Sequence, residues 1–259
     1  MSKTGSRTAV YSALILRSRP SKSAATNHES NTEVFLLTAE EGIINATVFG
    51  GAKSKLRSHS APYNSGQVWI YRDPAKGYSK LSDFDVHSWR PGLRELYERT
   101  MAAGSVADTI LSSHGGGGEW SIALKLAIAV LDALETANEE LCARLLVHFL
   151  WRWAEFLGIQ PDLEYCTACE KTAGDKSIWF NVRDNSVLCA NCFCSTNFAS
   201  PQPLLHLNPG SRRWLAATGG LEPSLLHRYS MDNKSFNEAR ELTSAVMTAA
   251  LGKQLNWDW

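Results

Sequence analysis

Hydrophobic and polar residues alternate in five short segments near the start of the chain. A period of two is typical of strands that bury one face. Turn residues bound these segments, as in Glu40-Glu41-Gly42 and Asp73-Pro74-Ala75-Lys76-Gly77. Five such strands fit a barrel of the oligonucleotide-binding (OB) type, which predicts an OB-fold nucleic-acid-binding domain over residues 1–87. The expected strands are Thr8–Arg17, Glu33–Thr38, Ile43–Gly50, Gln67–Arg72 and Tyr78–His87.

The hydrophobic period becomes helical from Trp89 onward. Two apolar helices are expected at about 119–136 and 138–158, preceded by a glycine run at 115–118 that indicates a linker. Apolar helices of this kind are typical of a bundle, whose first part we place at 88–160 and second part at 201–259. Further helices are expected at Leu207–Ala217, Glu222–Arg228 and Ser235–Leu251, the last beginning with a capping box, Ser235-Phe236-Asn237-Glu238.

Two Cys-x-x-Cys pairs lie between these helices, in a segment that we place at 161–200. Two such turns offer four thiolates to a tetrahedral ion, and their spacing is typical of a structural zinc site. The stretches Ser177–Val182 and Ser186–Leu188 predict two short strands joined by a turn, which completes the outline of a zinc ribbon. The fold class expected is therefore α+β multidomain, a five-stranded OB-type barrel followed by an α-helical bundle with an inserted four-cysteine zinc ribbon. The expected ligands of one zinc ion are Cys166, Cys169, Cys189 and Cys192.

Other interpretations of these cysteines remain open. Two disulfides suit a secreted chain, and a redox motif normally occurs as a single Cys-x-x-Cys. Catalytic zinc keeps an open position that four thiolates do not leave. Cys194 is an alternative fourth ligand, whereas Cys142, in an apolar helical stretch, is best interpreted as a small core residue.

The first apolar run, Ala9–Leu16, is short and is followed by Arg17 and Arg19. It lacks the cleavage pattern of a signal peptide and is better interpreted as a strand. No stretch has the length needed to span a bilayer. We therefore expect a cytoplasmic protein without membrane contact.

The net charge of zero conceals an uneven distribution. Residues 1–80 contain eleven Lys and Arg against five Asp and Glu, which gives +6; the remainder of the chain therefore carries −6. Such asymmetry favours a basic binding domain joined to an acidic one, although a chance distribution of solvated charges is the alternative.

The basic residues of the barrel gather at strand ends and turns, where they can contact DNA phosphates. Tyr63, Trp69, Tyr71 and Tyr78 offer rings for base stacking, but for Trp69 we favour a place in the barrel core. The DNA-binding set expected is Arg17, Arg19, Lys53, Lys55, Arg57, Arg72 and Lys76.

Barrel, helices and inserted ribbon, in this order, resemble the RecO family of recombination mediators. Leu16–Pro20, Leu36–Thr38 and Glu41–Ile43 are similar to the family's opening hairpin, and Gly51–Arg57 is similar to its basic loop. Phe149–Gly158, continuing to Cys166 and Cys169, is similar to its entry into the metal segment. The match is weakest at 20–31 and after 200.

The resemblance implies a non-enzymatic protein that binds single- and double-stranded DNA and anneals complementary strands. It also implies a RecR-type partner, the tail of single-strand-binding protein as a second partner, and help in loading recombinase onto coated DNA. By residue match it assigns DNA contact to Lys53, Lys55 and Arg57, with Arg17 and Arg19. Association with the nucleoid follows from such a role.

Two other functions compete with this interpretation. One is a protein-binding scaffold that has a zinc ribbon but no affinity for DNA. The other is a zinc enzyme, which is disfavoured because the Pro-Cys-x-x-Cys of zinc deaminases is absent, Tyr165 preceding Cys166, and no His-Glu-x-x-His occurs.

Overall fold

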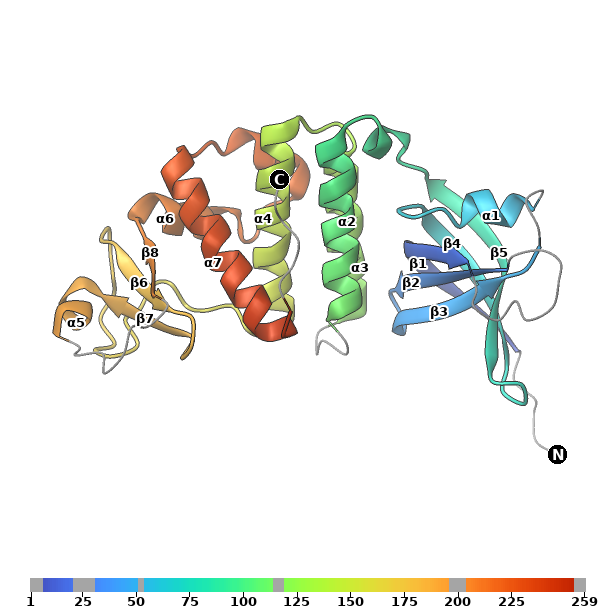
Figure 1. Ribbon diagram of the computed structural model, residues 1–259, viewed down its shortest axis with the longest axis horizontal. Coiled ribbons are helices and arrows are strands. Elements are labelled where there is room, and N and C mark those ends of the chain that lie inside the picture. The colour runs from blue at the N-terminus through green and yellow to red at the C-terminus, as the bar shows by residue number, and fades with distance from the viewer. Residues whose placement is uncertain (1–6, 21–30, 51–53, 114–118, 196–203, 254–259) are drawn as a thin grey trace. The chain divides into compact units, whose positions relative to one another are not determined.

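The computed structural model of the chain describes residues 7–20, 31–50, 54–113, 119–195 and 204–253. These form two compact units, one of residues 7–111 and 119–136, and the other of residues 112–113 and 137–253. Figure 1 shows that the first unit contains the strands β1–β5 and the helices α1, α2 and α3, and that the second contains mainly helices with a small sheet. The fold class expected from sequence is confirmed, whereas the division into four segments stays a prediction.

The first unit contains a closed barrel with the strand order β1-β2-β3-β5-β4. Its core comes from alternate residues, among them Val34, Leu36, Val68 and Ile70. All strand pairs are antiparallel except β3 with β5. The strands are β1 (Thr8–Pro20), β2 (Thr32–Thr38), β3 (Gly42–Val48), β4 (Ser65–Asp73) and β5 (Tyr78–Ser88), with the short helix α1 (Lys55–His59) between β3 and β4.

Helices α2 (Tyr97–Ser112) and α3 (Trp120–Leu134) belong mainly to the same unit. Helix α3 packs against β1 and β2, where the paired residues Leu14 and Leu37 are fully buried outside the barrel core. A strand covered on both faces is expected to show a continuous apolar run, and residues 13–16 of β1 are such a run.

Arg90 joins the barrel to this helical layer. It follows β5 in a left-handed conformation, with φ of 46°, and its side chain is 1% exposed. Its Nε donates to Oδ1 of Asp132 on α3 at 2.7 Å, and its Nη1 donates to the carbonyl of Tyr63 at 2.6 Å and to Oγ of Ser65 at 3.0 Å. A buried guanidinium needs such partners, because an unpaired buried charge is strongly destabilising.

The second unit is built around α4 (Glu139–Phe156), whose buried Trp153 donates to Oγ of Ser113 at 2.8 Å. Helix α7 (Asn233–Leu251) packs on α4 and on α6 (Pro209–Thr218). A 3-10 helix, η2 (Pro223–Arg228), replaces the helix expected near residue 222, and a second one, η1 (Pro91–Arg94), precedes α2 in the first unit.

The ribbon is a three-stranded sheet with the order β7-β6-β8. Strands β6 (Ile178–Asn181) and β7 (Ser186–Cys189) are the predicted pair, and α5 (Ala190–Ser195) follows them. The third strand, β8 (Leu204–Leu207), overturns the expected helical start at Leu207, because α6 begins only at Pro209. Pairing of β8 with β6 is a long-range contact that local periodicity does not reveal.

The predicted capping box at Ser235 is also wrong. The N-cap of α7 is Asp232, whose side chain accepts from the Ser235 backbone N–H at 2.9 Å. Glu238 binds residues of β8 and α6 instead. Among the helices of the described chain, none combines the length and apolar character that crossing a bilayer would require.

Candidate nucleic-acid interface and candidate metal centre

Three of the predicted DNA-binding arginines form ion pairs on the barrel unit. Arg17 donates to Asp108, and Arg19 donates to Glu33 at 2.9 Å while lying 4.9 Å from the centroid of the Phe35 ring. Arg72 makes a two-pronged contact with Glu41, at 3.1 and 2.5 Å. Each exposed ion pair of this kind contributes only about 0.2–1 kcal/mol to stability. A DNA phosphate could therefore replace the carboxylate as the partner of the arginine.

Lys55, Arg57 and Lys76 are exposed, and none of them takes part in an ion pair within the part of the chain that the structure describes. Lys55 and Arg57 lie on α1, and Lys76 lies in the turn between β4 and β5. Lys53 falls outside the described residues. The DNA-binding set stays a prediction. Its exposed cations without an ion pair among the described residues lie on α1 and in the β4–β5 turn.

An aromatic side chain accompanies α1. His59, the last residue of this helix, packs edge-on against Trp89 with ring centroids 5.2 Å apart. The Nδ1 atom of His59 lies 3.0 Å from the carbonyl oxygen of Phe84, which fixes the imidazole on the barrel. Trp89 is 45% exposed, so its ring is accessible close to the helix that carries Lys55 and Arg57.

The prediction that Trp69 is in the barrel core is wrong. Its neighbours Val68 and Ile70 are the core residues, so strand alternation turns Trp69 outward, where it is partly exposed. Tyr63 is partly buried, and burial raises the pKa of its phenol. Sequence reasoning missed Phe49 and Lys80 on the outer face, although the alternation around Val48 and Leu81 could have identified both.

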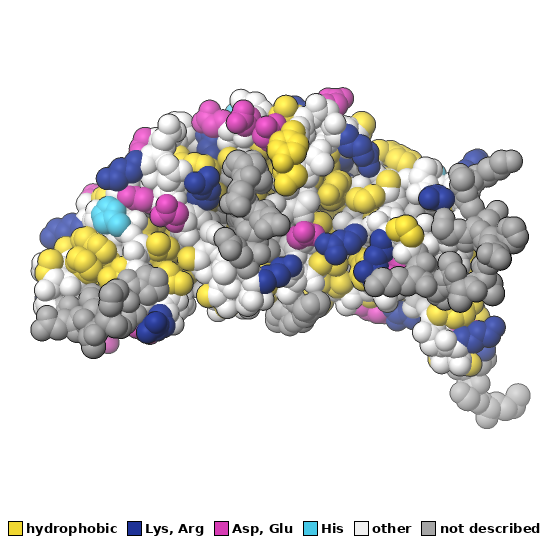
Figure 2. All heavy atoms as spheres, viewed as in Figure 1, with side chains coloured by type: hydrophobic (Ala, Val, Ile, Leu, Met, Phe, Trp, Pro, Cys, Tyr) yellow, Lys and Arg dark blue, Asp and Glu magenta, His cyan; other side chains and the backbone are white. Residues whose placement is uncertain are grey.

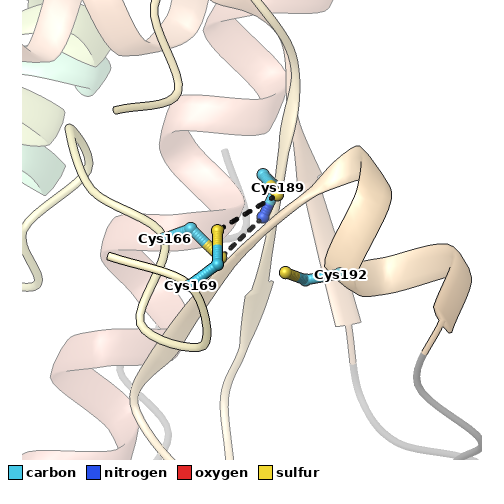
Figure 3. A group of neighbouring side chains, drawn as sticks. All are labelled: Cys166, Cys169, Cys189 and Cys192. Carbon is cyan, nitrogen blue, oxygen red and sulfur yellow. Dashed lines mark hydrogen bonds between the residues drawn. The ribbon is translucent and has the colours of Figure 1, made fainter. Parts of the chain in front are cut away.

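The four expected zinc ligands converge on one point, as Figure 3 shows. Their Sγ atoms all lie within 4.8 Å of one another, and the Cys169 and Cys189 sulfurs are 3.9 Å apart. Tetrahedral coordination with Zn–S bonds of about 2.3 Å places sulfurs about 3.8 Å apart. The spacing fits a four-thiolate site, and these residues can hold one metal ion.

Local backbone structure sets this geometry. The turn after Cys166 is closed by hydrogen bonds from Glu170 N to the Cys166 carbonyl at 2.8 Å and from Cys166 N to the Lys171 carbonyl at 3.0 Å. Cys189 ends β7, and Cys192 is on α5. Thr167 N donates to the Val187 carbonyl at 2.7 Å, which holds the first turn against β7.

Electrostatics also favour a cation at this point. Burial opposes ionisation of Cys166, but backbone N–H groups of Cys189, Cys169 and Ala168 lower the pKa of its thiol to about 6. The surrounding sulfurs of Cys169, Cys189 and Cys166 raise the pKa of Cys192 to about 12. Without a metal, Cys192 therefore keeps its proton, and ionisation of all four thiols together would need a compensating positive charge such as a divalent metal.

The other two cysteines are separate from this cluster. Cys194 is exposed and is not part of the group of four. Cys142 is fully buried in α4, which confirms it as a core residue.

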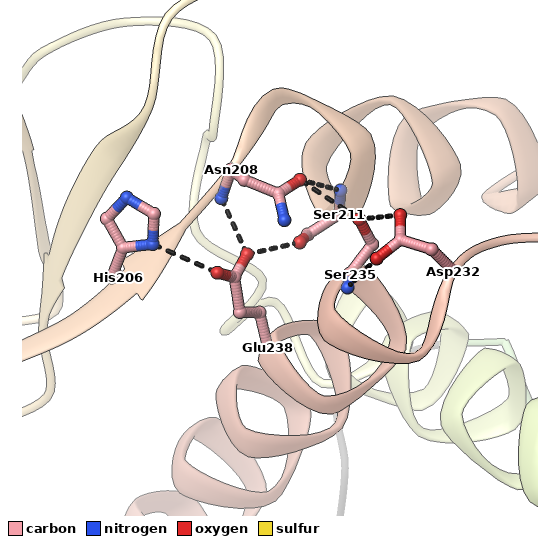
Figure 4. Close-up of polar contacts among 6 residues, drawn as sticks. All are labelled: His206, Asn208, Ser211, Asp232, Ser235 and Glu238. Carbon is pink, nitrogen blue, oxygen red and sulfur yellow. Dashed lines mark hydrogen bonds and ion pairs between the residues drawn. The ribbon is translucent and has the colours of Figure 1, made fainter.

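A polar network fastens β8 to the helices of the second unit (Figure 4). The Glu238 carboxylate on α7 accepts from Nδ1 of His206 at 2.9 Å, from the Asn208 N–H at 2.7 Å and from Oγ of Ser211 at 2.6 Å. Burial acts to raise the pKa of Glu238, but these hydrogen bonds lower it. Because β8 pairs with β6, this carboxylate helps to fix the ribbon sheet on its helical support.

Together these features define the class of the protein: an OB-type barrel with exposed cations, followed by helices and a ribbon whose four clustered thiols could hold a metal ion.

Comparison with known proteins agrees with this class. A family model described as "Recombination protein O C terminal" matches residues 94–257. The DNA repair protein RecO of Bacillus subtilis (strain 168) is 25% identical over 217 residues, which are 83% of this chain and 80% of that protein. The DNA repair protein RecO of Anaeromyxobacter sp. (strain K) is 26% identical over 238 residues, 88% of this chain and 87% of that protein. The family model spans more than half of the chain, which therefore belongs to the RecO family.

Proposed function

We propose that this protein acts in DNA repair as a recombination mediator. It binds single- and double-stranded DNA, anneals complementary strands, and helps to load recombinase onto DNA coated by single-strand-binding protein. No catalytic step is part of this role. A protein with this function acts at the chromosome, so we expect it in the cytoplasm, associated with the nucleoid.

The observation that carries the proposal is the distribution of charge on the barrel of a RecO-family chain. Lys55, Arg57 and Lys76 are exposed on α1 and on the β4–β5 turn. OB barrels use the loop between strands 4 and 5 for oligonucleotides. Lysine and arginine near phosphates release condensed counterions, which favours binding at low salt.

Two protein partners belong to the proposal: a RecR-type protein and the tail of single-strand-binding protein. Both follow from family membership and are not assigned to named residues. The acidic excess of residues 81–259, fifteen Lys and Arg against twenty-one Asp and Glu, does not by itself attract an acidic tail.

The metal is proposed to be one structural zinc ion held by Cys166, Cys169, Cys189 and Cys192. Four sulfur ligands at tetrahedral spacing suit zinc and leave no open coordination position for chemistry. Zinc held by these cysteines would supply folding energy to the ribbon.

Annealing of complementary strands precoated with the cognate single-strand-binding protein tests the function. Wild type is compared with a variant carrying Lys53→Ala, Lys55→Ala and Arg57→Ala. A matched control removes three lysines outside the barrel: Lys125 on α3, Lys171 in the ribbon and Lys234 on α7, all exposed. We expect wild type and the control to anneal the strands and the barrel variant to lose most of this activity.

Each outcome has a distinct meaning. If both wild type and the barrel variant anneal the strands, the proposed function is supported, but Lys53, Lys55 and Arg57 are not the DNA-binding site. If wild type neither anneals coated strands nor binds bare DNA at low salt, the mediator function is wrong and the scaffold alternative replaces it.

A further inference from the structure

An exposed aromatic pair lies where the barrel closes between β3 and β5. Phe49 directly follows β3, and Tyr78 begins β5. Their ring centroids are 6.1 Å apart with an interplanar angle of 70°. Phe49 is 42% exposed and Tyr78 is 36% exposed, so both rings leave a large part of their surface accessible.

Strand alternation explains why these side chains point away from the core. Val48 and Leu81 belong to the barrel core, so their neighbours Phe49 and Lys80 lie on the outer face. Tyr78 is two residues from Lys80 and shares that face. The outer face therefore carries two rings and a lysine, and Figure 2 shows hydrophobic and Lys or Arg side chains next to one another over the barrel.

Two cations accompany the rings. The Nζ atom of Lys80 lies 5.8 Å from the centroid of the Phe49 ring. Lys76 is exposed in the turn that leads into Tyr78. Neither lysine takes part in an ion pair formed by the described residues, so both charges are available to an anionic ligand.

Acidic side chains limit the patch on one side. Asp83 and Asp85 are exposed further along β5 and repel phosphates. An anionic chain is therefore favoured only at the end of β5 that carries Tyr78 and Lys80.

We propose that Phe49 and Tyr78 form a stacking site for unpaired bases of single-stranded DNA, with Lys76 and Lys80 contacting its phosphates. The inference rests on the proposed DNA-binding function and adds to it a preference for single strands. Stacking needs an exposed base face, which a single strand offers and a duplex keeps within its own stack. The position agrees with OB barrels, which bind oligonucleotides near strands 2–3 and the β4–β5 loop.

The test separates base contacts from phosphate contacts. Fluorescence anisotropy of the full-length protein is measured with a labelled oligothymidine and with an abasic oligomer that has the same number of phosphates. Wild type is expected to bind the oligothymidine roughly tenfold or more tightly than the abasic oligomer. Phe49→Ala with Tyr78→Ala removes most of this difference, leaving affinity for the abasic oligomer, affinity for duplex DNA and the salt dependence unchanged.

Lys80→Ala has the opposite signature. It weakens binding to both oligomers, keeps the preference for bases, and makes the slope of log K against log salt shallower by about 0.7. Tyr97→Ala on α2, where the tyrosine is 64% exposed, is the matched control and leaves every measurement at the wild-type value.

Melting temperatures check that each variant is folded. A second double variant, Phe49→Leu with Tyr78→Leu, keeps apolar bulk but removes both π-faces. It should also reduce the preference for the oligothymidine over the abasic oligomer. The proposal is overturned if a folded double variant keeps the wild-type preference for bases, or if it loses duplex binding equally. In either case DNA binding itself stands. Wild type that binds neither oligomer at low salt would overturn the proposed function as well.

Discussion

Trp120 lies directly against Gly42. A Cβ atom at Gly42 would lie 2.7 Å from Cδ2 of the Trp120 indole, closer than real Cβ contacts allow. Gly42 also has φ of +73°, in the left-handed region that side chains disfavour. Gly42 begins β3 and Trp120 begins α3, so this contact seats the helix on the barrel.

Gly42→Ala is therefore expected to destabilise the protein by about 2–5 kcal/mol, the sum of backbone strain and overpacking. Urea unfolding monitored by tryptophan fluorescence measures it. Gly77→Ala is the matched control, because Gly77 has φ of +65° but open space around its Cβ position. Gly77→Ala should lose only the stability that corresponds to backbone strain, about 1 kcal/mol. Equal losses in both variants would mean that the indole contact is unimportant.

Cys166→Ser should abolish stable metal binding. Elemental analysis is expected to find about one zinc per wild-type chain and much less in the variant, with a melting temperature several degrees lower, since ligation energy is folding energy. Cys194→Ser, at an exposed cysteine outside the cluster, should retain both the metal and the melting temperature. The assignment would be contradicted if wild type contained no zinc, or if removing the metal with a chelator left the melting temperature unchanged.

Glu238→Gln should destabilise the second unit by about 1–3 kcal/mol, because the carboxylate that accepts from His206, Asn208 and Ser211 is lost. Since the folded pKa of Glu238 lies below its ordinary value of 4.5, the contribution is complete above pH 4.5 and is lost as pH falls through the folded pKa. The difference in melting temperature between wild type and variant should therefore shrink in acid. Glu241→Gln, at an exposed carboxylate on the same helix, should have little effect at any pH.

His148 should make the protein sensitive to mild acid. It is fully buried in α4, and neither ring nitrogen has a hydrogen-bond partner among the described residues. Burial, assisted by the charge of Arg152, lowers its pKa from 6.5 to about 4. The unfolded chain therefore takes up a proton that the folded chain refuses, and stability falls between pH 6.5 and 4.

His148→Leu removes this pH-dependent loss of stability. Between pH 7 and pH 5 the variant should lose about 2 kcal/mol less stability than wild type, as measured by denaturant unfolding at each pH. A parallel decline in the two proteins would show that His148 is protonated in the folded state.

Local patterns predicted the strands of the barrel and the clustering of four cysteines, because alternation and Cys-x-x-Cys spacing are themselves local signals. Trp69 was misassigned because aromatic character alone does not say which face of a strand is buried; its neighbours Val68 and Ile70 decide that. Glu238 fitted a capping box within its own helix, but long-range partners on β8 and α6 bind it instead. Strand β8 likewise depends on pairing with a distant segment.

The barrel closes through a single pair in the described residues, Thr47 with Lys80, whereas its other strand pairs extend over seven positions or more. Few backbone hydrogen bonds oppose separation of β3 from β5, so local opening there requires less free energy than elsewhere in the barrel. Amide hydrogen exchange should accordingly be fastest along these facing edges. A ligand that contacts Phe49 on one edge and Tyr78 on the other would hold them together and slow that exchange.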